Sequence, residues 1–318
     1  MEENRSKSRK SVRTLVNILL ALLCIIFLVV FVFLKKQETE KNDHLFLLNN
    51  NINEVNNVIS EQKDQIDNLE NQIKELNDID ETIVKTRESF VNQAIALEEK
   101  IKNGESNNKI AYLTFDDGPY RLTEQFLDIL DEYDVKGTFF CLKKNEEYGY
   151  YPENVEVYNR VINRIINSGH VLGNHTASHA LGRNGIYSSL DAFVNSVIEN
   201  RNYIQNEFSY NTTVFRFPGG SGTAGQLYGP ISEELRKLGY CWVNWNSMTG
   251  DGNGPTAVSV EESISNVLDK TGNNKFLVVL MHDYSNNTLK ALPNIIEGLR
   301  SQGYSFLPLF NGSQAVFD

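Results

Sequence analysis

The chain has 318 residues, a formal net charge of −11, an apolar fraction of 41% and three cysteines. A chain of this length typically forms about two domains, and this composition is typical of a folded globular protein. It excludes a wholly disordered or collagen-like chain, and three cysteines are too few for a disulfide-stapled scaffold. The acidic balance argues against a nucleic-acid partner, because such partners usually require a basic face.

The first 34 residues predict a membrane anchor. Residues 1–13 form a basic tail with five basic and two acidic side chains, and residues 14–34 carry no charge. A helix over the 20 residues from Leu15 to Leu34 would span the roughly 30 Å core of a bilayer. The alternative is a cleaved signal peptide, whose apolar region is usually shorter and ends in small residues, whereas this run ends in Lys35-Lys36. We therefore predict an uncleaved transmembrane helix over residues 14–34.

The flanking charges predict the orientation of this helix. More Lys and Arg residues precede it than follow it closely, so the positive-inside rule places the N-terminus in the cytoplasm and residues 37–318 outside the cell membrane. Cys141 and Cys241 then lie in the extracellular part. Their pairing stays open, because sequence spacing does not define a disulfide.

An acidic stretch with a heptad repeat follows the anchor. Between Leu45 and Ile101, fourteen of the seventeen a and d positions are apolar, and Gln62, Asp80 and Arg87 interrupt them. This repeat predicts a coiled-coil spacer over residues 37–103, with a parallel homodimer as the preferred assembly. The alternative is one amphipathic helix packed on its own domain.

The remaining residues, 109–318, predict an α/β domain. Seven short apolar runs alternate with six helical patterns. The runs are Ile110–Phe115, Gly137–Leu142, Val171–Gly173, Thr213–Phe217, Tyr240–Asn244, Phe276–Met281 and Tyr304–Pro308. The helical patterns cover about 121–133, 156–167, 188–207, 230–238, 259–270 and 288–302. Such alternation indicates parallel βα units, in a small barrel or an open doubly wound sheet, with the site at the C-terminal ends of the strands.

Titratable side chains follow five of these strands. Asp116-Asp117 ends the first strand, His175 and His179 follow the third, and Arg216 is in the fourth. Asp251 follows the fifth, and His282 ends the sixth. One carboxylate and two imidazoles form a three-ligand set that suits Zn²⁺, with Co²⁺ as an alternative. A second carboxylate and a separate histidine add a base and an acid, which together predict metal-assisted hydrolysis of an amide or ester.

The segments Thr114–Pro119, His175–His179, Arg216–Gly219, Trp245–Asp251 and Leu280–His282 resemble the five motifs of the NodB-type polysaccharide deacetylases, carbohydrate esterase family 4. The resemblance covers residues 109–318 and implies a distorted (β/α) barrel. It also implies that Asp116 is the general base, that Asp117, His175 and His179 bind the metal, and that His282 is the general acid. Further roles implied by the resemblance are positioning of Asp116 by Arg216, tuning of His282 by Asp251, oxyanion binding by the backbone N–H of Tyr120, and substrate binding by Pro218, Gly219, Trp245 and Leu280. His170, which also matches a recurrent family position, is given a structural role.

The fourth motif departs from the family pattern, which has Asp-Trp where this chain has Asp251-Gly252. Trp242, Trp245 or Tyr228 is expected to replace the missing wall of the groove. The resemblance and the anchor together predict a membrane-bound, metal-dependent deacetylase that acts on an extracellular polysaccharide, with peptidoglycan N-acetylglucosamine as the preferred substrate. The alternatives are an O-acetyl esterase on other glycans and a non-catalytic glycan-binding scaffold.

Overall fold

The computed structural model describes residues 2–143, 155–254 and 256–313, without the side chains of residues 2–16 and 80. The chain divides into two compact units, Met1–Lys85 and Thr86–Asp318. The second unit contains all of the predicted site residues, so it is the part of the chain that positions the chemistry.

The first unit consists of helix α1 (Glu2–Lys102), which continues into the second unit. From residue 17 onward, α1 includes an apolar stretch without buried residues and is long and apolar enough to cross a membrane. Its apolar side chains from Ile18 to Leu34 are exposed. Farther along, the apolar heptad positions from Leu45 to Ile83 are exposed as well.

The last turns of α1, from Thr86 to Lys102, belong to the globular unit. Ala94, Glu98 and Ile101 are buried there, and the Glu98 carboxylate accepts a 2.7 Å hydrogen bond from the buried Tyr112 hydroxyl. The heptad pattern predicts a spacer that ends at residue 103, whereas in the structure these last turns pack against the strands. The alternative of a helix packed on its own domain therefore describes this end of α1.

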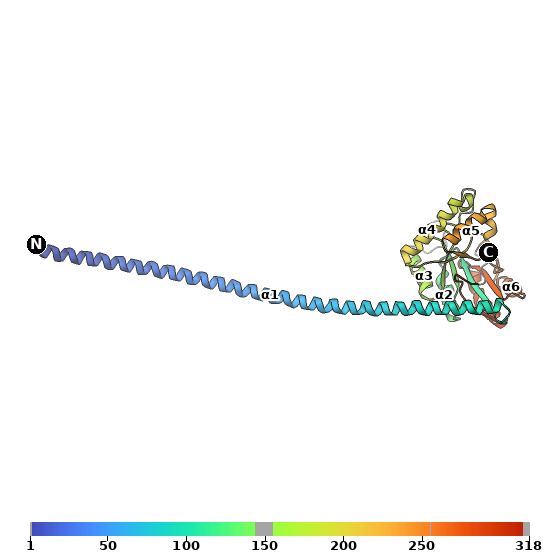
Figure 1. Cartoon of the computed structure of the whole chain (residues 1–318), viewed down its shortest axis with the longest axis horizontal. Coiled ribbons are helices and arrows are strands. Elements are labelled where there is room, and N and C mark those ends of the chain that lie inside the picture. Colours follow the sequence, from blue (N-terminus) through green and yellow to red (C-terminus); the bar gives the residue numbers. More distant parts are fainter. Residues whose placement is uncertain (1, 144–154, 255, 314–318) are drawn as a thin grey trace. The chain divides into compact units, whose positions relative to one another are not determined.

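The described residues after α1 form eight parallel strands and six α-helices. Figure 1 shows this part of the chain as arrows and coiled ribbons. The strands are β1 (Lys109–Asp116), β2 (Thr138–Cys141), β3 (Val171–Asn174), β4 (Val214–Phe215), β5 (Cys241–Trp242), β6 (Ser247–Met248), β7 (Phe276–His282) and β8 (Tyr304–Phe306). The helices are α2 (Thr123–Glu132), α3 (Val155–Asn167), α4 (Leu190–Phe208), α5 (Tyr228–Lys237), α6 (Val260–Leu268) and α7 (Asn286–Ser301). All seven predicted strands and all six predicted helices are present, and the short β6 was not predicted.

The sheet order is β5-β4-β3-β2-β1-β7-β6, and β8 pairs with the first residues of β1. No pairing between β5 and β6 closes the sheet within the described residues, so the expected distorted, incomplete barrel is confirmed. Nearly every residue of β1 and β7 is buried, which explains why both read as almost continuous apolar runs. Cys141 and Cys241 are both free thiols.

The register of the strands brings the motif residues to one edge. Asp116 at the end of β1 pairs with His282 at the end of β7, and Asn174 at the end of β3 pairs with Phe215 in β4. His175 and Arg216 therefore leave neighbouring strands side by side. The C-terminal edge of the sheet is where ligands are expected in parallel α/β folds.

Candidate active site

Two adjacent carboxylates leave β1 in different directions. Asp116 is the last residue of the strand and is 4% exposed. Asp117 has a φ of 69°, a left-handed conformation that turns the chain sharply before Gly118. This turn aims the Asp117 carboxylate at the histidines that follow β3.

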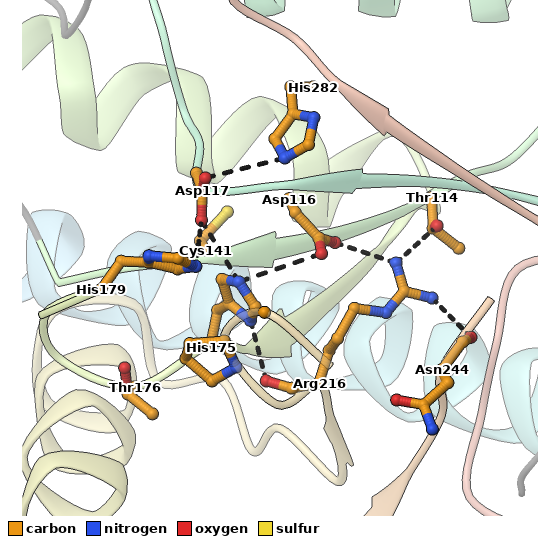
Figure 2. A network of polar contacts seen from close by, with 12 residues as sticks. Thr114, Asp116, Asp117, Cys141, His175, Thr176, His179, Arg216, Asn244 and His282 are labelled. Carbon is orange, nitrogen blue, oxygen red and sulfur yellow. Dashed lines mark hydrogen bonds and ion pairs between the residues drawn. The ribbon is translucent and has the colours of Figure 1, made fainter. Parts of the chain in front are cut away.

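Asp117, His175 and His179 form a cluster that suits a metal ion (Figure 2). The Asp117 Oδ1 atom lies 3.2 Å from His175 Nε2 and 3.7 Å from His179 Nε2. One ligand atom from each residue lies within 4.8 Å of the others. Two imidazole nitrogens and one carboxylate oxygen match the donors of catalytic zinc sites, which leave a further position open for water. The donor set therefore fits a divalent cation.

The backbone fixes the orientation of His175. Its Nδ1 atom lies 2.8 Å from the carbonyl oxygen of Arg216, so Nδ1 carries the proton and donates it there. With a metal bound, the Nε2 lone pair would be free for the ion, which is the tautomer that a metal requires. Without one, a proton on Nε2 can donate to Asp117.

Asp116 is held by a buried arginine. The Arg216 Nη1 atom donates to Asp116 Oδ1 at 2.9 Å and to Thr114 Oγ1 at 2.7 Å. Its Nε and Nη2 atoms donate to the carbonyl oxygens of Val243 and Asn244, at 3.1 and 3.2 Å. The second Asp116 oxygen, Oδ2, lies 3.9 Å from His175 Nε2 and so faces the candidate metal cluster.

His282 approaches the same cluster from β7. Its Nε2 atom lies 3.7 Å from Asp117 Oδ2, and its Nδ1 atom lies 2.9 Å from Asp251 Oδ1. The other Asp251 oxygen accepts hydrogen bonds from the His282 backbone N–H and from the Thr288 hydroxyl. Asp251 therefore holds both the main chain and the ring of His282, although the sequence did not indicate Thr288.

The net effect of burial, hydrogen bonds and neighbouring charges raises the pKa of His282 and lowers the pKa values of Asp117 and His179. Burial lowers the pKa of His282, but the hydrogen bond to Asp251 and the nearby carboxylates outweigh it and raise this pKa to about 9. Burial raises the pKa of Asp117, but the hydrogen bond to His175 and the neighbouring imidazoles hold it below its usual range. Burial lowers the pKa of His179. The neutral imidazole that this favours at His179 is the form that binds a metal.

Trp245 and Leu280 are two of the predicted substrate residues, and Leu280 precedes His282 by two residues in β7. The Arg216 guanidinium carbon lies 5.8 Å from the centre of the Trp245 ring, so Trp245 packs beside the arginine. Leu280 is 8% exposed and pairs in register with Met248, an exposed side chain of β6. The sequence did not indicate that Met248 lies beside Leu280, because a two-residue strand has no apolar periodicity.

Of the other predicted groove residues, Pro218 and Gly219 lie in the loop after β4, Tyr228 begins α5, and Trp242 ends β5. The Pro218 carbonyl accepts a hydrogen bond from the Tyr187 hydroxyl at 2.9 Å, and Gly219 has a φ of 71°. Trp242 is 2% exposed, so it does not form the missing groove wall. The half-buried Tyr228 accepts a hydrogen bond from the Trp242 indole N–H at 3.3 Å.

The backbone N–H of Tyr120, predicted to bind an oxyanion, has a partner within its own turn. Its backbone N–H donates to Thr123 Oγ1 at 2.7 Å, within the turn that leads into α2. A donor already directed at a side chain is poorly placed to meet an oxyanion, which requires donors aimed at the reacting oxygen. An oxyanion role for Tyr120 would require this N–H to leave Thr123 when substrate binds, and it stays a prediction.

Comparison with known proteins finds close parallels for the globular unit. The sequence model of a family described as polysaccharide deacetylase matches residues 103–241. The chain is 31% identical over 205 residues to the protein named "Putative polysaccharide deacetylase YheN" of Bacillus subtilis, and the match covers 63% of this chain and 66% of that protein. It is also 31% identical over 209 residues to a peptidoglycan-N-acetylglucosamine deacetylase of Bacillus cereus, covering 62% of this chain and 68% of that protein. The match thus spans about two thirds of the length of these relatives.

A solved structure shows the same fold. The catalytic domain of a peptidoglycan N-acetylglucosamine deacetylase from Eubacterium rectale superposes with a TM-score of 0.58 at 31% sequence identity. The superposition covers 67% of this chain and 93% of that one.

Proposed function

Because the chain belongs to the polysaccharide deacetylase family, we propose that it removes N-acetyl groups from an extracellular polysaccharide in a metal-dependent hydrolysis. The observation that carries the proposal is the placement of two further groups beside the candidate metal cluster. Asp116 Oδ2 and His282 Nε2 each lie less than 4 Å from a ligand of that cluster. A base held by an arginine and an acid held by a carboxylate therefore meet at one site.

The reaction joins water to the acetamide carbonyl carbon and breaks the C–N bond, giving acetate and a free amine. Asp117, His175 and His179 would hold a divalent cation, which polarises a carbonyl and acidifies a water molecule when bound. Asp116 accepts the proton that the attacking water loses. His282 donates a proton to the departing nitrogen, which needs it because an amine anion is a very poor leaving group. Arg216 and Asp251 keep the base and the acid in position.

We propose peptidoglycan N-acetylglucosamine as the substrate. Several relatives are named peptidoglycan-N-acetylglucosamine deacetylases, including two of Bacillus cereus that share 29% and 31% identity with this chain. A single membrane anchor followed by a spacer would also deliver the globular unit to a cell wall. An O-acetyl esterase activity on other glycans is the second candidate, since one relative is a bifunctional xylanase/deacetylase.

Acetate release by the full chain in detergent micelles tests the function. We expect release from peptidoglycan and from N-acetylglucosamine oligomers when Zn²⁺ is supplied, and loss of release with a chelator. Asp116→Asn should abolish release but retain zinc binding, whereas His179→Asn should lose both. His170→Asn, a buried histidine outside the cluster, is the matched control and should retain both at pH 7.

Two results would refute this proposal. Zinc-loaded enzyme that releases no acetate while Asp116→Asn binds glycan as well as the natural protein would indicate a glycan-binding scaffold. Release from acetylated xylan but not from N-acetylated glycans would indicate the esterase.

The proposed location is the cell membrane, with a cytoplasmic N-terminus and an extracellular catalytic unit. The uncharged helix over residues 14–34 and the basic tail before it support this topology. Protease added to intact cells should remove the catalytic unit, and its persistence on intact cells but not on permeabilised ones would contradict the topology.

We also propose that α1 forms a parallel homodimer. Its apolar heptad positions, such as Ile52, Ile59 and Ile66, are exposed in the single chain, and a repeat of this length is typical of a coiled coil. The mass of the fragment 37–318 in solution tests this assembly. We expect twice the mass of one chain, and a strictly monomeric fragment would contradict it.

A further inference from the structure

Asp283, the residue after the proposed acid His282, lies against the turn that carries Asp117. Its side chain is completely buried. A Cβ atom placed on Gly118 would come within 2.8 Å of both Asp283 carboxylate oxygens. No side chain larger than hydrogen therefore fits at residue 118 unless one of these two groups shifts, so the turn after β1 packs directly against the end of β7.

A hydrogen-bond chain strengthens this contact. The Tyr120 backbone N–H donates to Thr123 Oγ1 at 2.7 Å, and the Thr123 hydroxyl in turn donates to Asp283 Oδ2. Thr123 is completely buried at the start of α2. The loop that connects Asp117 to α2 is thus hydrogen-bonded to this carboxyl group through Thr123 and packs closely against it at Gly118.

The other oxygen of Asp283 makes this carboxyl unusual. Its Oδ1 atom is buried and has no hydrogen-bond partner among the described residues. Burial raises the pKa of Asp283 to about 7, although the hydrogen bond from Thr123 opposes this rise. A buried polar atom without a partner costs folding free energy, so stability alone does not account for an aspartate here.

We propose that Asp283 is a positioning residue for the deacetylation reaction. It holds the Asp117–Thr123 turn against β7, so that the Asp117 carboxylate and the His282 imidazole keep the 3.7 Å separation of Oδ2 and Nε2. This inference rests on the proposed function, because it assigns Asp283 to the geometry of that same site. Residues behind metal ligands typically change metal affinity or activity by about 10- to 100-fold when they are replaced.

Four variants of the full chain in micelles test the inference. Asp283→Ala removes the acceptor, and Asp283→Asn keeps an oxygen for the Thr123 hydroxyl and the size of the side chain. Thr123→Val breaks the chain from its other end at nearly constant volume. Thr138→Val is the matched control, because Thr138 is also completely buried and its Oγ1 accepts a 2.8 Å hydrogen bond from the Leu309 backbone N–H. Thr138 begins β2, at the opposite end of the strand from the site.

Three quantities are measured for each variant: kcat, KM and the affinity for Co²⁺. The Co²⁺ affinity is obtained from the visible absorption of the Co²⁺-loaded protein. We expect Asp283→Ala and Thr123→Val to weaken Co²⁺ binding and to lower kcat, each by about tenfold, with little change in KM. Asp283→Asn should recover most of both quantities, and Thr138→Val should change only thermal stability.

Unchanged Co²⁺ affinity and kcat in Asp283→Ala and Thr123→Val would overturn the inference. A failure of Asp283→Asn to recover these quantities would overturn it too. If Asp283→Ala does not fold, the inference is tested by comparing the Co²⁺ affinity and kcat of Thr123→Val with those of Thr138→Val. If the natural protein neither binds Co²⁺ nor releases acetate, both the proposed function and this inference are overturned. If the natural protein is active and the variants do not change Co²⁺ affinity or kcat, only the inference is refuted.

Discussion

Arg216 and Asp116 lie 100 positions apart in the chain and meet in the interior, with the Arg216 Nη1 atom 2.9 Å from Asp116 Oδ1. The arginine is completely buried, and its side chain donates hydrogen bonds to Asp116, Thr114 and two backbone carbonyls. A planar guanidinium can satisfy several acceptors in fixed directions, whereas an ammonium cannot. Asp116 is therefore held in one orientation, with its second oxygen towards the candidate metal cluster.

Replacement of Arg216 by lysine should lower kcat by about 100-fold. The positive charge remains, but a lysine cannot donate to Asp116, Thr114 and both carbonyls together, so the carboxylate loses its fixed direction. Zinc affinity should change little, because Arg216 contacts His175 only through its backbone oxygen. Acetate release and zinc titration measure the two effects. Arg164→Lys, which replaces an arginine paired with Asp128 and Asp131, is the control, and an equal loss in both variants would argue against the positioning role.

Asp251→Asn should lower kcat by about 10²- to 10⁴-fold. Asp251 Oδ1 accepts the Nδ1 proton of His282, and an amide there can turn its N–H₂ group towards the ring and favour the wrong tautomer. Thr288→Val removes one hydrogen bond to the same carboxylate and should cost much less, about tenfold. Single-turnover acetate release measures both. If Thr288→Val lost as much activity as Asp251→Asn, the hydrogen bond between Asp251 and the His282 ring would not account for the loss.

The fold was predictable because its strands are buried on both faces. Residues Phe276 to Met281 form an unbroken apolar run that reads directly as a strand, and β1, β3, β4 and β7 each end at or one residue before a motif residue. The two-residue strand at Ser247–Met248 has no such run and was missed. The site residues were predicted from polar groups at strand ends, a pattern that needs no knowledge of side-chain contacts.

Features that depend on three-dimensional packing were not predictable. The a and d positions of the last heptads, such as Ala94 and Ile101, look the same whether they face a second helix or the globular unit. The contact between Asp283 and Gly118 exists only because the turn after Asp117 folds back on β7. The burial of Trp242 likewise follows from its surroundings and not from its place in a motif.

The last turns of α1 should be required for a stable catalytic unit. A fragment that begins at Thr86 retains Ala94, Glu98 and Ile101, which are buried in the globular unit. A fragment that begins at residue 109 exposes the surface that these residues cover, including the Tyr112 hydroxyl. We expect the longer fragment to unfold at a clearly higher temperature and to keep its activity. Equal melting temperatures would show that these turns are dispensable.

Tyr112→Phe should destabilise the protein by about 1–3 kcal/mol, because it leaves the buried Glu98 carboxylate without this hydrogen-bond donor. Burial and the nearby Glu98 charge both raise the pKa of Tyr112, so the hydroxyl remains a donor over the whole physiological range. Urea unfolding measures the loss. Adding Glu98→Gln to Tyr112→Phe removes the buried charge and should recover part of the stability, and no recovery would contradict this explanation.

His170 should make the stability of the protein fall in mild acid. Its ring is completely buried, its Nδ1 atom accepts the Gly137 backbone N–H at 3.0 Å, and its Nε2 atom lies 3.9 Å from Asp131 Oδ1. Burial, helped by the charges of Lys136 and Arg164 and opposed by that of Asp131, lowers the pKa of His170 to about 4. The unfolded chain binds this proton near pH 6.5, so its contribution to stability is complete above that pH and is lost as the pH falls towards 4.

The size of this effect follows from linkage. A histidine pKa that falls from 6.5 to about 4 on folding corresponds to a loss on the order of 3 kcal/mol between those two pH values. His170→Asn removes the titrating group and keeps an oxygen that can accept the Gly137 N–H. We expect the free energy of unfolding, measured in urea at pH 7 and pH 4.5, to fall less in the variant than in the natural protein. Equal falls in the two proteins would show that other groups cause the acid sensitivity and that His170 is not its source.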